Sequence, residues 1–385
     1  MLHGAPSGRR GDHVRVLVVT IVHDPRDSRI FARQIGAMLD AGWRVTFAAP
    51  FSATGAPVPE RPGLRVLDLP RAHGRRRATA WRAARRTVRR HGPEHDLVLL
   101  HDPELVPATA SRRARAVVWD VHEDTAGAIE HKSWLPRHAR RAAAASARWF
   151  ERWSERRFDL ILAEHAYQER FAVQHTVVPN TVRVPDEVEP SGDCEVVYVG
   201  SLTLVRGALD LIEVGRQLRT RTDGAVRLRL IGPADEPTTI ALESAVQAGD
   251  LLWDGRLPSE LAMKALGGAL AGLSLLHDTP NYRASLPTKV VEYMAHGVPV
   301  VTTPLPLAKA LVERAGCGFV VPYATPSVAV DAVLQLRDDP ELRASMAAAG
   351  RATAVDEFDW TVQSAAFLAE LERIALARRK RSASR

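Results

Sequence analysis

A lysine and a glutamate three positions apart, in a short proline-led helical segment, carry the clearest chemistry of this sequence. Lys289 and Glu292 share one face of the helix predicted within residues 285–297, with Pro287 near its start and Gly297 after its end. Lysine offers positive charge to a phosphate, and glutamate can accept two hydrogen bonds from ribose hydroxyls. A surface ion pair is the alternative, but it requires none of the surrounding pattern. The segment therefore predicts a nucleotide-binding site.

A second candidate is the loop that follows the apolar run 196–199. It begins with Gly200 and contains Arg206 just before or inside the next predicted helix. A helix N-terminus carries partial positive charge and unpaired N–H groups, and a guanidinium fits phosphate oxygens. The loop therefore predicts a diphosphate site, with a surface arginine as the alternative. It matches neither the Gly-x-Gly-x-x-Gly dinucleotide pattern nor a P-loop, so dehydrogenase and P-loop functions lose their usual support.

A histidine after a predicted strand is the third candidate. His122 lies between Asp120 and the pair Glu123 and Asp124. The acidic neighbours predict a raised pKa for this imidazole, whose ring could orient sugar hydroxyls. A purely structural loop histidine is the alternative.

Short β-branched runs alternate with helical patterns along the chain, which is typical of parallel sheets built from βαβ units. Before residue 185, strands are predicted at 14–21, 45–49, 64–69, 97–100, 116–121, 160–163 and 176–178, with a helix at 29–41 after the first. After residue 193, strands are predicted near 196–199, 228–231, 273–276, 299–303 and 319–321, and a helix at 361–377. All three candidates fall in loops after strands, where open α/β sheets bind ligands.

The length of 385 residues favours two domains. We predict an N-terminal Rossmann-like domain at 12–184, a Pro/Glu/Asp-rich linker at 185–193 and a C-terminal Rossmann-like domain at 194–358. The C-terminal helix, placed at 361–380, is expected to pack back on the first domain. Two doubly wound domains of this kind would face a central cleft.

The net charge of +7 comes almost entirely from arginines, which are densest from Arg71 to Arg90. This stretch predicts either a solvated helix face or a basic amphipathic helix resting on anionic lipid. No nucleic-acid-binding module accompanies it, so nucleic acid is not an expected partner. No apolar run approaches the ~20 residues of a membrane span, and residues 1–14 do not resemble a signal peptide. These features predict a cytoplasmic protein, peripheral to the membrane if the arginine stretch binds lipid.

Five further segments carry a resemblance to a known family. They are Asp27-Ser28-Arg29-Ile30, His101-Asp102-Pro103-Glu104-Leu105, Trp119-Asp120-Val121-His122-Glu123, Val178-Pro179-Asn180 and the stretch Pro287 to Ala295. With them the chain resembles the retaining glycosyltransferases of family 4, which have the GT-B fold, over residues 14–374. It is most similar to a bacterial subgroup of that family.

The resemblance implies a metal-independent, retaining glycosyltransferase without cofactor. It would move a sugar from a nucleoside diphosphate sugar, UDP- favoured over GDP-, to the hydroxyl or similar nucleophile of an unidentified acceptor in polysaccharide or natural-product biosynthesis. No aspartate pair has the Asp-x-Asp spacing that holds a metal in other glycosyltransferases. Catalytic roles fall to His122, Arg206 and Lys289. The expected donor-binding residues are Gly200, Ser201, Arg206, Ser285, Leu286, Pro287, Thr288, Lys289 and Glu292. The expected acceptor-side residues are His23, Asp24, Arg29, His101 and Asp102.

Two positions depart from the family pattern. Ala284 stands where many members have a glutamate that touches the donor sugar, and Ser201 stands where an arginine is common. These departures motivate one alternative, a nucleotide-sugar-binding protein without turnover. A nucleotide-sugar epimerase is a second alternative, because such enzymes share this architecture and a similar nucleotide pocket.

Overall fold

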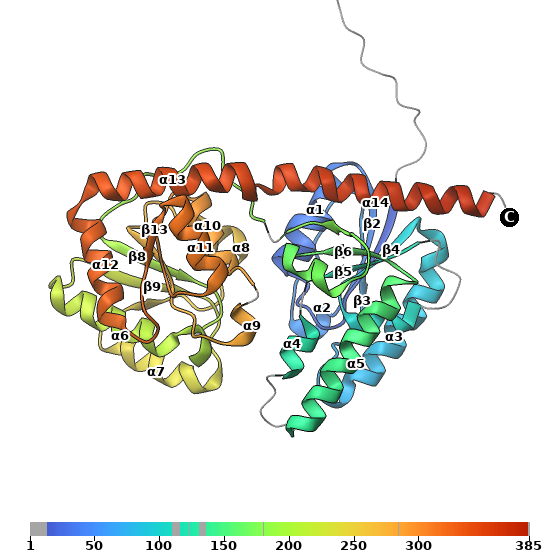
Figure 1. The fold of residues 1–385 in the computed structure, drawn as a ribbon, viewed down its shortest axis with the longest axis horizontal. Helices are drawn as coiled ribbons and strands as arrows, with labels where there is room; N and C mark the ends of the chain where they lie inside the picture. The colour runs from blue at the N-terminus through green and yellow to red at the C-terminus, as the bar shows by residue number, and fades with distance from the viewer. Residues whose placement is uncertain are drawn as a thin grey trace, which may run out of the picture. The chain divides into compact units, whose positions relative to one another are not determined.

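The computed structural model describes residues 14–109, 116–122, 124–130, 136–179, 181–283 and 285–383. The chain divides into two compact units (Figure 1). The first contains the chain up to residue 126, residues 142–179 and the end of the chain from residue 362, and the second contains residues 127–141 and 180–361. Ala284, Glu123 and Asn180, which the sequence singled out, lie outside the described residues.

The first unit is built on a parallel sheet with strand order β3-β2-β1-β4-β5-β6-β7. Its described strands are β1 (Arg15–Val19), β2 (Arg44–Ala49), β3 (Leu64–Asp68), β4 (Leu97–Leu100), β5 (Val117–Val121), β6 (Asp159–Leu162) and β7 (Thr176–Val177). The chain winds away from β1 in one direction and returns through β4 in the other. The switch point of this doubly wound sheet therefore lies between β1 and β4.

The second unit repeats the design with strand order β10-β9-β8-β11-β12-β13. Its described strands are β8 (Glu195–Val199), β9 (Arg227–Ile231), β10 (Leu252–Trp253), β11 (Ala271–Ser274), β12 (Val300–Thr302) and β13 (Gly318–Val320). Its switch point lies between β8 and β11, and all of its strand pairs are parallel. The two parallel sheets confirm the predicted α/β class.

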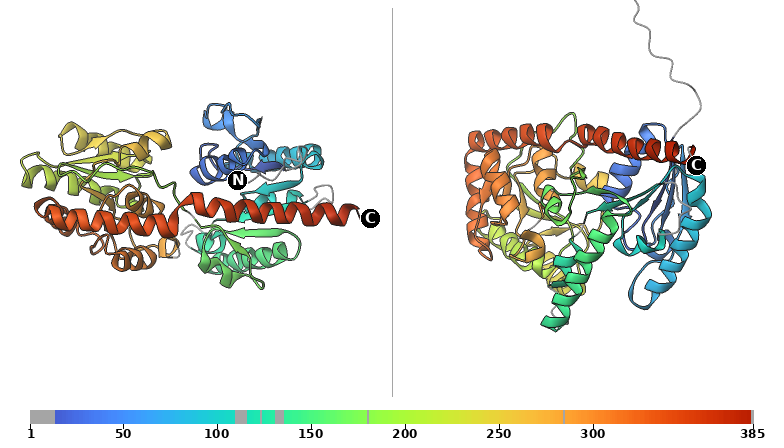
Figure 2. Two further views of the ribbon diagram at one scale, coloured as in Figure 1. Left: turned by 90° about the horizontal axis from the view of Figure 1, so that it is seen from above. Right: turned by 45° about the vertical axis from the view of Figure 1, so that its right-hand side comes forward.

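Helices cover the faces of both sheets (Figure 2). Up to residue 179 they are η1 (Ser28–Ile35, a π-helical stretch), α1 (Gly36–Asp40), α2 (Phe51–Thr54), η2 (Gly74–Arg76), α3 (Arg77–His91), η3 (Gly92–Glu94), η4 (Pro103–Leu105), η5 (Pro107–Thr109), α4 (Thr125–Glu130), α5 (Arg137–Glu155) and η6 (His165–Arg170). Beyond it they are η7 (Leu204–Arg206), α6 (Ala208–Arg221), α7 (Glu236–Gln247), α8 (Ser259–Lys264), α9 (Pro280–Arg283), α10 (Thr288–Ala295), α11 (Pro306–Ala315), α12 (Pro326–Asp338), α13 (Pro340–Phe358) and α14 (Trp360–Ala383).

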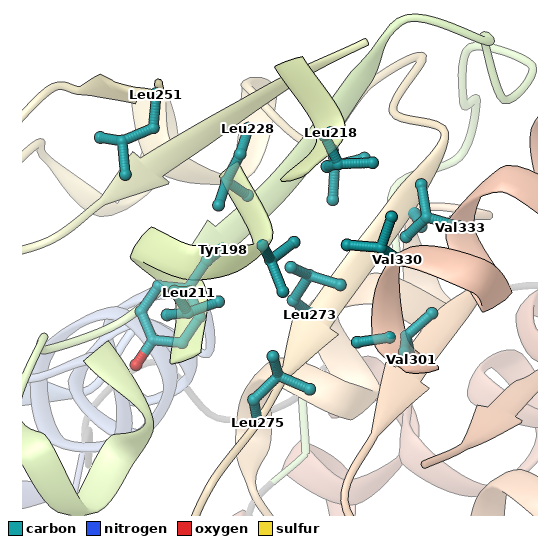
Figure 3. Packing of buried hydrophobic residues seen from close by; sticks show 14 of the residues in the cluster. Tyr198, Leu211, Leu218, Leu228, Leu251, Leu273, Leu275, Val301, Val330 and Val333 are labelled. Atoms are coloured by element: carbon teal, nitrogen blue, oxygen red, sulfur yellow. The ribbon is translucent and has the colours of Figure 1, made fainter. Parts of the chain in front are cut away.

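The central strands read as continuous apolar runs because helices bury both of their faces. β4, Leu-Val-Leu-Leu, is buried at every position. In the second unit, one cluster packs Leu211 and Leu218 of α6 against β8, β9 and β11 (Figure 3). Tyr198 lies at the margin of that cluster, and its hydroxyl points away from the labelled aliphatic side chains. The core therefore delivers a polar group toward the carboxyl end of β8.

Residues 185–193, expected to be a linker, lie inside the second unit. The Gly192 N–H donates to the Gly268 carbonyl at 2.8 Å, and the Ser191 hydroxyl donates to the Gly297 carbonyl at 2.8 Å. Arg351 donates to the carbonyl of Pro185 at 2.7 Å. Proline and acidic residues made this stretch look like a linker, but its hydrogen bonds to Gly268, Gly297 and Arg351 attach it to the second unit. The division between the units falls at residue 179 instead.

The C-terminal helix α14 spans Trp360–Ala383, and its residues from Val362 onward group with the first unit. Phe367, Leu371 and Ile374 are buried along one face, at the spacing that an amphipathic helix predicts. None of the described helices combines the length and the apolar character that crossing a membrane requires.

Candidate functional site

The predicted donor residues gather at the switch point of the second sheet. Gly200 follows β8, and the segment that leads into α10 follows β11. Beyond their last paired residues, β8 and β11 are bridged by the Tyr293 hydroxyl, which accepts from the Val199 N–H at 3.0 Å and donates to the Leu273 carbonyl at 3.0 Å. A side chain from α10 thus holds the two strand ends together at the point where ligands bind in such sheets.

Lys289, in the first turn of α10, is the most unusual residue of this site. Its side chain is only 6% exposed, yet its Nζ makes no hydrogen bond within the described part of the chain. The amine lies 3.7 Å from the centroid of the Tyr198 ring. Burial, with the nearby Arg206 charge, lowers the pKa of Lys289 well below its usual range, and Glu292 opposes this shift. A buried amine without a counterion is costly, so an anionic ligand is the partner that this position suits.

Two glycines leave space for the Lys289 amine and for the loop that follows β8. A Cβ on Gly200, whose φ is +135°, would lie 3.1 Å from the Lys289 Nζ. A Cβ on Gly207, whose φ is +78°, would lie 2.2 Å from the Leu275 carbonyl oxygen. Glycine is required at both places because other residues disfavour this backbone conformation and a Cβ would collide or crowd the amine.

Arg206 ends the short helix η7, immediately before Gly207 and α6. Its Nε donates to the Tyr282 hydroxyl at 3.2 Å. The Arg206 charge contributes to the lowered pKa of Lys289, so the two basic side chains lie close enough to interact. The structure therefore brings together Gly200, Arg206 and Lys289 from two segments about eighty residues apart in the sequence.

The other predicted donor residues lie around these three. The Ser201 carbonyl accepts from the Tyr198 hydroxyl at 2.8 Å, Pro287 precedes the first turn of α10, and Leu286 packs against the neighbouring hydrophobic cluster. Ser285, Thr288 and Glu292 are half-buried. The Tyr198–Ser201 bond fixes the loop beside the amine of Lys289.

Asp120, at the end of β5, organises the polar site of the first unit. It accepts two hydrogen bonds from Arg29, Nε to Oδ2 at 2.8 Å and NH2 to Oδ1 at 2.7 Å, and one from Gln34 at 2.9 Å. Burial alone would raise the pKa of this carboxyl, but the Arg29 charge and hydrogen bonds outweigh it and hold the pKa well below its usual range. Arg29 thus serves as a buried counterion in the first unit.

His122 is a neutral imidazole with a lowered pKa, whereas its acidic neighbours in the sequence predicted a raised pKa. Its Nδ1 lies 3.0 Å from the Asp120 carbonyl oxygen, and its Nε2 lies 3.1 Å from the Nε2 of His23. Burial lowers the pKa of His122 to about 3. Asp120 acts to raise this pKa, and the positive charge of His23, His101 and Arg29 acts to lower it further. The prediction of a raised pKa was wrong because burial of the ring, aided by the neighbouring positive groups, outweighs the attraction of Asp120.

The tautomers of this histidine pair follow from their partners. A carbonyl only accepts, so the proton of His122 is on Nδ1 and its Nε2 accepts from the Nε2–H of His23. His23 also lies 3.4 Å from Asp102, which accepts from the N–H groups of Ile21 and Val22. His122 can therefore act as a neutral hydrogen-bonding group and not as a proton donor of imidazolium type.

The remaining predicted acceptor-side residues differ in their surroundings. The His101 ring is fully buried, with Nδ1 3.3 Å from Asp120. Asp24 instead forms a bidentate pair with Arg26, at 2.8 and 2.7 Å. The structure thus joins His23, His101 and Asp102 with Asp120 and His122, whereas Asp24 binds a neighbour on its own loop.

One cluster has the ligand types of a metal site. His101, Asp120 and His122 each offer a ligand atom, and these atoms lie within 4.8 Å of one another. Both oxygens of Asp120, however, already accept from the Arg29 guanidinium, and a divalent cation beside that charge would be repelled. The donor set does not fit a cation while Arg29 occupies the carboxylate.

Three residues of these sites were not found from the sequence. Tyr198 and Tyr282 contact the two donor-site cations, and Glu164 follows β6 at the carboxyl edge of the first sheet. Burial raises the pKa of Glu164 to about 7, and the Arg29 charge opposes the rise. Single tyrosines or glutamates after strands have no spacing pattern, so nothing in the sequence distinguished them.

Comparisons with known proteins agree with this architecture. Residues 28–185 match the glycosyl transferase 4-like domain and residues 183–353 match glycosyl transferases group 1. No curated protein sequence matches the chain.

Solved structures share the fold at low sequence identity. Sucrose-phosphate synthase from Thermosynechococcus elongatus has a TM-score of 0.71 and 16% identity, covering 95% of this chain and 100% of its own. HepE from Anabaena, in complex with UDP-glucose, has a TM-score of 0.69 and 15% identity, covering 94% and 100%. WaaG, a glycosyltransferase involved in lipopolysaccharide biosynthesis, has a TM-score of 0.66 and 15% identity, covering 92% and 98%. Together, the two domain matches and the shared fold show a chain of GT-B fold in which a glycosyl transferase 4-like domain is followed by a group 1 glycosyl transferase domain.

Proposed function

We propose that the protein transfers a sugar, with retention of anomeric configuration, from a nucleoside diphosphate sugar to a hydroxyl or similar nucleophile of its acceptor. The buried Lys289 amine carries this proposal, because it has no hydrogen-bond partner in the described chain and lies beside Gly200. A diphosphate would be the negatively charged partner of this amine and of Arg206. UDP is favoured over GDP, since the structure of HepE, which shares the fold, holds UDP-glucose.

The chemistry requires stabilising the negative charge that grows on the departing diphosphate. Arg206, Lys289 and the N-termini of α6 and α10 supply positive charge there. Attack on the same face of the sugar, with the leaving phosphate taking the acceptor proton, fits this arrangement. His122, held neutral, would orient sugar hydroxyls without delivering a proton. His23, Arg29, His101 and Asp102 would shape the acceptor side.

An assay with UDP- and GDP-sugars tests this function. We expect purified protein to release nucleoside diphosphate, by transfer when an acceptor is present and by slow hydrolysis without one. Interconversion of the sugars would instead identify an epimerase, and tight binding without any product would identify a binding protein. A bacterial polysaccharide or natural product is the acceptor class to screen first.

The proposed reaction needs no metal, because the two cations occupy the role of a divalent ion. We expect the rate of nucleoside diphosphate release to stay unchanged when EDTA is added. Loss of activity that added Mg²⁺ restores would contradict this part of the proposal.

Glu292 is proposed to bind the ribose of the donor. Glu292→Ala is expected to weaken UDP binding roughly 10- to 100-fold, as for the loss of hydrogen bonds to a charged group. Titration calorimetry with UDP and with 2′,3′-dideoxy-UDP checks the role. The variant should bind the dideoxy analogue as well as the wild type does. An equal loss of affinity for both ligands would show that Glu292 does not bind the ribose hydroxyls.

A contact with anionic membranes is proposed for η2 and α3. All arginines between residues 71 and 90 are exposed, and no acidic residue interrupts them. The expected amphipathic helix has no apolar face left, because Ala80, Ala84 and Val88 are buried in the core of the first unit. Any such contact is therefore electrostatic. The triple variant Arg82→Glu, Arg86→Glu, Arg89→Glu should no longer sediment with phosphatidylglycerol vesicles at low salt. If the wild type binds phosphatidylcholine vesicles as well as phosphatidylglycerol vesicles, the electrostatic contact is refuted.

A further inference from the structure

Arg206 is a long side chain on a one-turn helix, and its Nε donates to the Tyr282 hydroxyl at 3.2 Å. The guanidinium carbon lies 5.9 Å from the centroid of the Tyr282 ring, so the tyrosine contacts it through both the hydroxyl and the ring face. A free arginine of this kind would lose rotamer freedom on binding a ligand. The contact with Tyr282 restricts that freedom before a ligand arrives.

The segment that carries Tyr282 is fastened on both sides of Arg206. The His277 N–H donates to the carbonyl of Val205, the residue before Arg206, at 3.0 Å. The His277 Nε2 lies 2.6 Å from a carboxylate oxygen of Asp210, in the first turn of α6. Tyr282 itself donates its N–H to the Thr279 carbonyl at 2.9 Å. The tyrosine is therefore held in a fixed place relative to the helix turn that it contacts.

The hydrogen bond leaves the useful part of the guanidinium available. The Tyr282 oxygen accepts from Nε and takes none of the N–H groups on the two terminal nitrogens of Arg206. The phenol proton also remains able to donate. Two parallel N–H groups match the oxygens of a phosphate, and an arginine held by its Nε presents them in one orientation.

We propose that Tyr282 is a positioning residue that orients Arg206 toward the donor diphosphate. This inference rests on the proposed function, because it requires a nucleoside diphosphate at the site. Tyr282 would act on binding through Arg206 and not by holding the fold, which makes its effect dependent on the arginine.

A double-mutant cycle tests the proposal, with UDP affinity measured by titration calorimetry. Tyr282→Phe keeps the ring and removes the hydroxyl, and Arg206→Lys keeps the charge and removes Nε. Tyr282→Phe is expected to weaken UDP binding about 10-fold in the wild type, the size typical of a hydrogen bond to a charged group. In the Arg206→Lys background the same change should have less than about a two-fold effect, because the partner is absent.

Tyr323→Phe is the matched control, because its hydroxyl makes no hydrogen bond in the described chain and it is half-buried in the same unit. It should bind UDP like the wild type. Equal losses from Tyr282→Phe in both backgrounds, or no loss in either, would overturn the positioning role while the wild type still binds UDP. If the wild type binds neither UDP nor GDP, the proposed function itself fails, and the two failures are thus distinguishable.

Discussion

Replacing Lys289 by methionine is expected to abolish measurable stabilisation by UDP while making the unliganded protein more stable. Methionine matches the length of the buried lysine stem and removes an amine that has no hydrogen-bond partner. Removing a buried unsatisfied polar group should raise the free energy of unfolding by about 1–3 kcal/mol. The wild type should gain about 2.7 kcal/mol at a UDP concentration of 100 times its Kd, and the variant should gain almost nothing.

Thermal unfolding with and without UDP measures both effects of this substitution. Lys264→Met is a matched control, since Lys264 is exposed at the end of α8 in the same unit. It should leave the UDP-induced shift in Tm unchanged. A Lys289→Met variant that is less stable and still responds to UDP would show that the lysine supports the fold instead of the ligand.

The lowered pKa of Lys289 also sets the sign of two pH effects. Between this lowered value and the usual 10.5, the unfolded chain binds more protons at this group than the folded chain. Stability of the unliganded wild type should therefore rise with pH across that window, and Lys289→Met should lack this rise. A bound diphosphate favours the charged amine, so UDP binding should take up a proton and weaken as pH rises. Calorimetry in buffers of different ionisation enthalpy measures that uptake.

Replacing Arg206 by alanine should lower turnover more than it lowers donor affinity. The guanidinium faces charge that grows on the diphosphate during the reaction, and loss of one such donor typically costs about 10²- to 10³-fold in kcat. Lys289 remains to bind the ground state, so KM for the donor should rise only about 10-fold, the size of the loss in UDP affinity expected when Tyr282→Phe releases Arg206.

The control for this variant is Arg216→Ala, which removes an exposed arginine of α6 that pairs with Glu213. Initial rates with a UDP-sugar give kcat and KM for both variants. An Arg206→Ala enzyme with unchanged kcat and a raised KM would mean that Arg206 binds substrate and transition state equally, and so would contradict its catalytic role.

Motif spacing was sufficient to predict which residues gather at the switch point of the second sheet. Lys289 and Glu292 lie three apart on one short helix, and Gly200 and Arg206 lie in one loop, so each pair is a local feature of the chain. Strand patterns likewise predicted most of the parallel strands, because strands buried on both faces are written as continuous apolar runs. The two-residue strand β10 was missed, since Leu252 and Trp253 are too short a run to give a pattern.

The pKa of His122 and the linker show where local patterns mislead. Acidic neighbours in the sequence predicted a raised pKa for this histidine, but the structure buries its ring and places Arg29 against Asp120 from ninety-one positions away. Residues 185–193 have the composition of a linker, yet partners such as Gly268 and Arg351 bond to their backbone. In both cases the deciding group is distant in sequence and adjacent in space.

The sequence by itself determined which residues are the candidates for binding a nucleotide diphosphate, because their types and spacing within one helix and one loop are local. Only the tertiary structure decided that Lys289 is buried over Tyr198 without a partner, that Tyr282 holds Arg206, and that His122 is neutral. Those properties depend on desolvation and on charges brought together by the winding of parallel strands. No spacing within a single segment encodes them.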